Sequence, residues 1–135
     1  EDIKKIGDHD TAMILMKSKK GVLIHINNSR RAVYGYDQRV EIFGSKGMLL
    51  SNNQTPTSIE KFNETGTFIK EPIYNFFIER YDQAYKSQLD DFVEKIENKQ
   101  QPSVTFEDGR KALILANTAY KSLENNSSTK VEYEF

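Results

Sequence analysis

The spacing of apolar residues changes once along this chain, near Tyr74, and this change limits the possible folds more than any other feature. Before it, short segments alternate between apolar and polar residues, which is typical of β-strands. After it, apolar residues recur every three or four positions, which is typical of amphipathic helices. Strands come first and helices second, so the order predicts an α+β fold.

Six short strands are predicted in the first half of the chain. Two form a hairpin over residues 11–29, with a polar turn that ends at Gly21. Two more flank the tight turn Gly44–Gly47, and another pair flanks a turn at Asn63–Gly66. These connections are too short for crossovers, so the strands should be mostly antiparallel. We therefore expect one open, mostly antiparallel (mixed) sheet of about six or more strands, with two helices packed on one face.

Two helices are predicted in the second half. The first has apolar positions at helical spacing over Tyr74–Asn98 and ends before a proline. The second should begin after Thr105, because Thr105 and Asp108 have the spacing of a capping box. The turn Asn125–Ser128 should then lead into a last strand over residues 130–135.

Composition excludes several functional classes. The chain has 135 residues, enough for one domain, and its 19 basic and 20 acidic residues give a net charge of −1. This balance argues against a nucleic-acid or anionic-membrane partner, because both require a basic surface. The chain has no cysteine and no apolar segment long enough to span a membrane, and we expect a cytoplasmic protein. It begins at Glu1 without an initiator methionine, which we interpret as a segment cut from a longer chain, and a processed terminus would look the same.

Three short motifs give no catalytic, cofactor-binding or metal-binding residue. The Gly44–Gly47 segment leads into a strand, whereas a dinucleotide-binding turn leads into a helix. Asp8, His9 and Asp10 are possible metal ligands, but neighbours in an extended segment point to opposite sides, so a polar connection is favoured. His25 has no acidic partner nearby in sequence and is expected to be packed or solvated.

The segment between Arg30 and Arg39 contains two tyrosines, Tyr34 and Tyr36, separated by Gly35. In an extended chain both phenols lie on one side, and the glycine allows a partner to approach closely. Phenols and guanidinium groups suit a ligand with many hydroxyl groups. The alternative is a sheet edge with ordinary tyrosine packing, and the residues alone slightly favour that alternative.

Longer sequence blocks carry a resemblance to a known family. Residues 7–47 contain the blocks YGYDQR and VEIFG, and three further blocks lie at residues 77–85, 104–109 and 112–116. Through these blocks nearly the whole chain resembles the C-terminal domain of the Gfo/Idh/MocA oxidoreductases. The first blocks are similar to the inositol 2-dehydrogenase branch, and the helical blocks are generic to the wider family.

The resemblance implies that residues 1–135 form a substrate-binding and oligomerisation domain. An N-terminal Rossmann domain, upstream of Glu1, would bind NAD and carry the catalytic residues, so this segment alone should be inactive. The implied substrate is myo-inositol, oxidised to a ketone, and the sheet face implies a homo-oligomer, a dimer or tetramer. Two alternatives stay open: another sugar or cyclitol as the substrate, or a non-catalytic module that binds carbohydrate or protein.

The resemblance also implies three substrate-binding residues. Tyr36 matches the position that reaches toward the polyol in the family, Tyr34 is a weaker candidate, and Tyr81 either borders the same cleft or packs in the core. Arg39 and Glu41 are expected to serve subunit contacts or solvation. His9 receives no role, because the family usually carries an apolar residue at its position.

Overall fold

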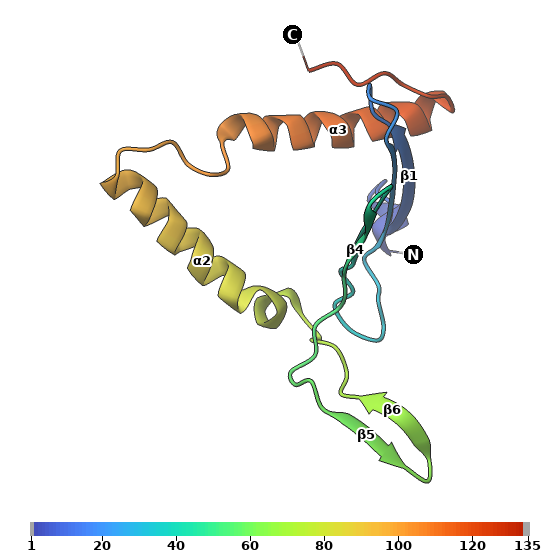
Figure 1. Ribbon diagram of the computed structural model, residues 1–135. Helices are drawn as coiled ribbons and strands as arrows, with labels where there is room; N and C mark the ends of the chain where they lie inside the picture. The colour runs from blue at the N-terminus through green and yellow to red at the C-terminus, as the bar shows by residue number, and fades with distance from the viewer. Residues whose placement is uncertain (1, 134–135) are drawn as a thin grey trace. The chain divides into compact units, whose positions relative to one another are not determined.

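The computed structural model describes residues 2–133 and confirms the α+β class. Helices and strands follow in the order α1 (Asp2–Lys5), β1 (Thr11–Lys17), β2 (Leu23–Ser29), β3 (Val40–Gly44), β4 (Gly47–Ser51), β5 (Glu60–Asn63), β6 (Gly66–Lys70), α2 (Phe77–Glu97) and α3 (Phe106–Asn125) (Figure 1). The chain divides into two compact units, Glu1–Tyr85 and Lys86–Phe135, and α2 continues across the boundary. All strands therefore belong to the first unit.

The six predicted strands form, but they do not form the predicted single sheet. They make three separate antiparallel hairpins, in which β1 pairs with β2, β3 with β4, and β5 with β6. Each hairpin is closed by a short turn, which brings its two strands together at little cost in loop entropy, whereas joining hairpins requires long-range edge pairing. The expectation of one open mixed sheet with two helices on one face is corrected to three local hairpins and helices.

The predicted last strand is also corrected. Lys130–Tyr133 has no strand conformation, and residues 134–135 lie outside the described residues. The carbonyl oxygen of Tyr133 accepts a hydrogen bond of 2.9 Å from Nη1 of Arg110 in α3. This side-chain contact connects the segment to α3, and the segment pairs with no strand within the described residues.

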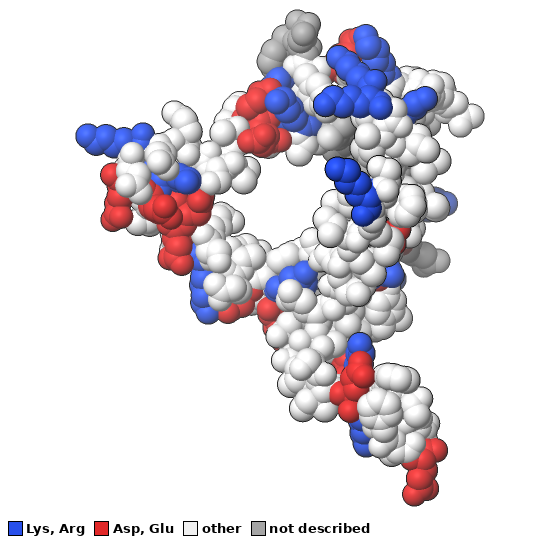
Figure 2. All heavy atoms as spheres, viewed as in Figure 1, with Lys and Arg blue, Asp and Glu red and all other residues white. Residues whose placement is uncertain are grey.

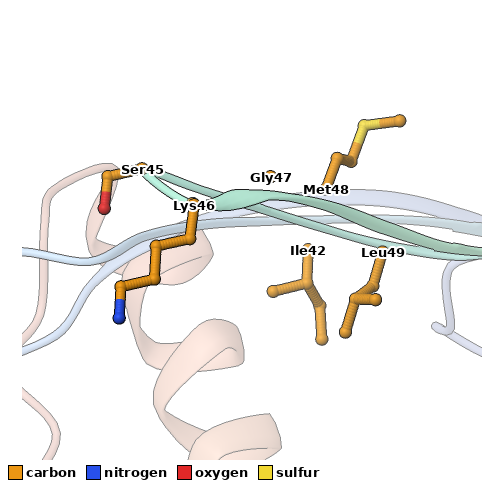
Figure 3. Close-up of a pocket in the computed structure, with 7 residues that line it drawn as sticks. Ile42, Ser45, Lys46, Gly47, Met48 and Leu49 are labelled. Carbon is orange, nitrogen blue, oxygen red and sulfur yellow. The ribbon is translucent and has the colours of Figure 1, made fainter.

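The β3–β4 hairpin is apolar on both faces. Ile42 pairs with Leu49 and both side chains lie on one face, whereas Met48, the partner of Phe43, lies on the other (Figure 3). All four side chains are more than half exposed, and a shallow depression at the turn is lined partly by Ile42 and Leu49. Strands that are apolar on both faces are typical of sheets covered on both sides. The hairpin therefore presents surface that a further layer of protein would cover.

This exposure extends to the rest of the described chain. Of residues 3–133, only Gly35 is buried, and no large apolar side chain is. Much of the visible surface over the strands is uncharged (Figure 2). No helix within residues 2–133 has the length and apolar character needed to cross a membrane. Exposed apolar surface on this scale marks regions that contact other protein.

Both predicted long helices are present, close to their predicted positions. The α2 helix begins three residues later than predicted and ends at Glu97. At the start of α3, Thr105 and Asp108 form the predicted capping box: the Thr105 hydroxyl accepts from the Asp108 N–H at 3.4 Å, and the Asp108 carboxylate accepts from the Thr105 N–H at 2.8 Å. These bonds satisfy N–H groups that have no partner within the helix.

Replacing Thr105 with alanine is expected to lower the free energy of unfolding by about 1 kcal/mol. Hydrogen bonds from Thr105 lower the pKa of Asp108, so the carboxylate stabilises the fold above its unfolded pKa. That contribution is lost as the pH falls through the lowered pKa, and the effect of Thr105→Ala should shrink with it. Urea unfolding at neutral and acidic pH measures both effects.

Thr118→Ala is the matched control, because Thr118 lies inside the same helix and its hydroxyl donates to the Ile114 carbonyl at 2.7 Å. That bond is not a cap, and alanine is a better helix former than threonine, so little or no loss of stability is expected. Equal losses for the two variants would contradict the assigned role of the capping box.

Candidate functional site

The loop that carries Tyr34 and Tyr36 is a turn rather than the extended segment that the sequence indicated. Its Gly35 N–H donates to the Ala32 carbonyl at 3.2 Å, and Gly35 has a φ of +133°. The two phenols therefore do not share one side in the way that extended geometry predicts. The close approach at the glycine does occur, since a Cβ there would lie 2.5 Å from Cγ1 of Ile73. Gly35 thus lets the loop pack against the segment that precedes α2.

Three segments of the first unit meet at this loop. The Tyr36 N–H donates to the Tyr74 carbonyl at 2.7 Å, and the Tyr74 N–H donates to the Gln54 carbonyl at 3.2 Å. The Gln38 N–H donates to Oδ1 of Asn53 at 2.7 Å. These bonds fix the backbone on both sides of Asp37 and connect the β2–β3 loop to the segments that follow β4 and β6.

Asp37 accepts hydrogen bonds from three side chains. Arg39 donates through Nε at 2.8 Å and Nη2 at 2.9 Å, Asn53 donates through Nδ2 at 2.8 Å, and Tyr34 donates its hydroxyl. The bonds from Arg39, Tyr34 and Asn53 lower the pKa of Asp37 to about 2. The bond to this carboxylate raises the pKa of Tyr34. We define this group, Tyr34, Asp37, Arg39 and Asn53, as the Asp37 brace.

Tyr36 and Tyr81, two of the three predicted site residues, are brought together. Their rings meet edge to face with centroids 5.6 Å apart, and the Tyr81 hydroxyl donates to Oε1 of Gln38. Burial, followed by a hydrogen bond with Tyr36, raises the pKa of Tyr81. The Tyr81 ring also contacts the ring of Tyr85 at 6.2 Å and lies 5.5 Å from Cζ of Arg80. We define Tyr36, Gln38 and Tyr81 as the polar aromatic cluster.

Tyr34, the third predicted residue, points to a different partner. Tyr34 is 61% exposed and its hydroxyl donates to Asp37, whereas Tyr36 is half-buried beside Tyr81. Arg39, for which subunit contacts or solvation were expected, forms a two-bond ion pair with Asp37. Glu41 is exposed on β3. The structure therefore separates a polar aromatic cluster from the brace beside it.

The sequence analysis missed Asp37, Gln38 and Asn53. The spacing Tyr34, Asp37, Arg39 was a usable signal, because a carboxylate with a phenol three residues before it and a guanidinium two residues after it has donors within reach. No local pattern indicated Asn53, which lies sixteen residues from Asp37.

The arrangement suits binding rather than proton transfer. Because the pKa of Tyr81 is raised, its hydroxyl stays protonated at neutral pH and acts as a hydrogen-bond donor. Phenol and amide groups side by side can bond successive hydroxyls of a polyol while ring faces cover its C–H groups.

The histidine motifs do not contribute to the cluster. Within the described part of the chain, no three His, Cys, Asp or Glu residues gather in a way that could hold a metal ion. Asp8 accepts hydrogen bonds from the His9 N–H and from Nη2 of Arg30, at 2.8 and 3.0 Å. His25 lies exposed on β2 opposite Leu15.

Comparison with known proteins shows the protein family to which this chain belongs. Residues 1–132 match the model of the C-terminal α/β domain of the Gfo/Idh/MocA oxidoreductase family. The chain belongs to this family, and the resemblance seen in its sequence blocks is confirmed.

Particular relatives are inositol dehydrogenases. The chain is 45% identical over 132 residues to myo-inositol 2-dehydrogenase of Thermotoga maritima, covering 98% of this chain and 39% of the relative. It is 39% identical to inositol 2-dehydrogenase of Rhizobium meliloti, covering 87% and 35%. A crystal structure of a myo-inositol dehydrogenase from Corynebacterium glutamicum aligns with a TM-score of 0.91 and 44% identity, over 98% of this chain and 40% of that one. The chain thus spans about two fifths of the length of these relatives.

Proposed function

We propose that residues 1–135 are the C-terminal substrate-binding and oligomerisation domain of an NAD-dependent inositol 2-dehydrogenase. The full-length enzyme would oxidise a ring hydroxyl of myo-inositol to the ketone. The observation that carries the proposal is the polar aromatic cluster. Tyr36 and Gln38, from a loop in the block similar to inositol dehydrogenases, meet Tyr81 of α2, so hydroxyl and amide groups gather there.

In this proposal the chain binds and orients the substrate. Tyr36 and Tyr81 would hold ring hydroxyls so that one C–H of the inositol faces the other domain, which raises the effective concentration of the reacting groups. NAD, bound by the companion N-terminal Rossmann domain, would supply the hydride acceptor. Gly44–Gly47 joins β3 to β4 as a hairpin turn, so it is not a phosphate-binding turn that leads into a helix.

The exposed apolar faces support the proposed partners. Ile42, Phe43 and Leu49 are between 60% and 83% exposed, and covering them would remove apolar area from water. We assign this cover to the companion domain and to further copies of the chain in a homotetramer. We propose that the enzyme is cytoplasmic and that it acts in inositol catabolism.

Steady-state kinetics of the full-length protein test the function. NADH formation is followed with myo-inositol, other inositol isomers and glucose, each with NAD and NADP. We expect the highest kcat/KM for myo-inositol with NAD, and no turnover by the isolated segment 1–135.

Other outcomes separate the alternatives. A preference for a non-cyclitol sugar would keep the family and replace the substrate. Carbohydrate binding without any oxidation would instead indicate a non-catalytic module.

A further inference from the structure

The Asn53 side chain bonds two consecutive residues at the centre of the loop, the backbone of Gln38 and the side chain of Asp37. Its Oδ1 accepts from the Gln38 N–H at 2.7 Å while its Nδ2 donates to the Asp37 carboxylate at 2.8 Å. The two bonds require opposite ends of the amide, so they fix its orientation. One side chain thereby sets the position of two consecutive loop residues.

Arg39 completes the hold on Asp37. Its Nε and Nη2 approach the two carboxylate oxygens at 2.8 and 2.9 Å, and this two-point contact fixes the plane of the carboxylate as well as its position. The Asp37 side chain is only 15% exposed, whereas that of Arg39 is 61% exposed, so the carboxylate is enclosed and the guanidinium faces water. With a pKa of about 2, Asp37 stays charged at neutral pH.

Asp37 lies between the two loop residues of the polar aromatic cluster. Tyr36 precedes it and contacts the Tyr81 ring, and Gln38 follows it and accepts from the Tyr81 hydroxyl. Within the described residues, the donors to the Asp37 carboxylate are Tyr34, Arg39 and Asn53, and none of these three belongs to the cluster. Any influence of Asp37 on a ligand at the cluster would therefore pass through the backbone of its neighbours.

We propose that Asp37 is a positioning residue for substrate binding: its brace holds the Tyr36 phenol and the Gln38 amide together at the hydroxyls of one polyol. This inference rests on the proposed function and assigns the brace a part in it. Because a bound ligand needs the hydroxyl and the amide at a fixed spacing, loosening the loop should weaken polyol binding more than it slows hydride transfer.

Asp37→Asn in the full-length enzyme tests the proposal, because asparagine keeps the shape and removes the charge that binds Arg39. We expect the KM for myo-inositol to rise about tenfold, with kcat within about twofold of wild type and the KM for NAD unchanged. Combined with Tyr36→Phe, the two changes should raise KM by clearly less than the product of their separate effects, because Asp37 acts through Tyr36.

Asp8→Asn is the matched control, since Asp8 also accepts from an arginine, Nη2 of Arg30, at 3.0 Å, yet belongs to neither the brace nor the cluster. It should leave the KM for myo-inositol unchanged. If Asp37→Asn does not fold, Tyr34→Phe replaces it, because that variant removes one donor to Asp37 and keeps the charge pair; it should raise the same KM about twofold to threefold.

The outcomes separate this inference from the proposed function. If wild type oxidises myo-inositol and the brace variants keep its KM, or if Asp37 and Tyr36 effects multiply independently, the positioning role is overturned and the function stands. A fall in kcat without a rise in KM overturns the positioning role as well. If wild type oxidises no polyol, both proposals fail.

Discussion

Gly35→Ala is expected to destabilise the full-length protein by about 2–4 kcal/mol. The added Cβ would lie 2.5 Å from Cγ1 of Ile73 and 3.0 Å from the Tyr74 carbonyl oxygen, so the loop or the segment before α2 must move. The φ of +133° adds strain, because L-residues with a side chain rarely adopt it. Thermal and urea unfolding followed by circular dichroism measure the loss.

Gly47→Ala separates the two causes. Gly47 has nearly the same φ, +137°, but a Cβ there would meet no atom within 4 Å. It should therefore show only the conformational cost, about 1–2 kcal/mol. Equal losses at the two positions would mean that the contact with Ile73 and Tyr74 contributes nothing.

The elements that the sequence predicted correctly depend on neighbours in the chain. The turn that ends at Gly21 sets the register of the β1–β2 hairpin, in which Ile14 faces Ile26. Thr105 and Asp108 are three residues apart, and their capping box needs no partner from elsewhere. Local spacing and turn residues were sufficient in both cases.

The pairing between hairpins could not be predicted in the same way. A meander of six strands with short connections indicates one sheet only if the edge of each hairpin meets the next, and no local signal tests that step. The apolar residues on both faces of β3 and β4 are also what a strand buried within one sheet would show. In the described structure Ile42 and Leu49 lie exposed on their own hairpin.

Contacts between distant residues of the candidate site also gave no local sequence signal. Tyr36 and Tyr81 were identified through the family resemblance, and the structure brings their rings into contact. Their part in substrate binding stays a prediction. The i, i+2 argument failed for Tyr34 because Gly35, with its positive φ, turns the loop between them. Gln38 and Tyr81 are forty-three residues apart, so only the folded chain shows that their side chains bond.

Tyr36→Phe should lower kcat/KM for myo-inositol in the full-length enzyme, if the hydroxyl bonds the substrate as proposed. The expected loss of transition-state stabilisation is about 1–3 kcal/mol. The KM for NAD should stay unchanged, since we propose that the domain containing Tyr36 binds the substrate and that NAD is bound by the companion domain. The variant also removes the hydrogen bond that, after burial, raises the pKa of Tyr81. A pH titration of tyrosinate absorbance should therefore show Tyr81 ionising at lower pH than in wild type.

Tyr85→Phe is the control for this prediction, because the Tyr85 ring contacts Tyr81 at a centroid distance of 6.2 Å while its side chain is 51% exposed. The change removes a hydroxyl from the same aromatic group and keeps the ring contact, so kcat/KM for myo-inositol should not change. If Tyr36→Phe and Tyr85→Phe both leave kcat/KM at the wild-type value, the Tyr36 hydroxyl does not bond the substrate. If both lower it equally, the loss at Tyr36 does not report a bond to the substrate, because Tyr85→Phe removes a hydroxyl that we place outside the substrate site.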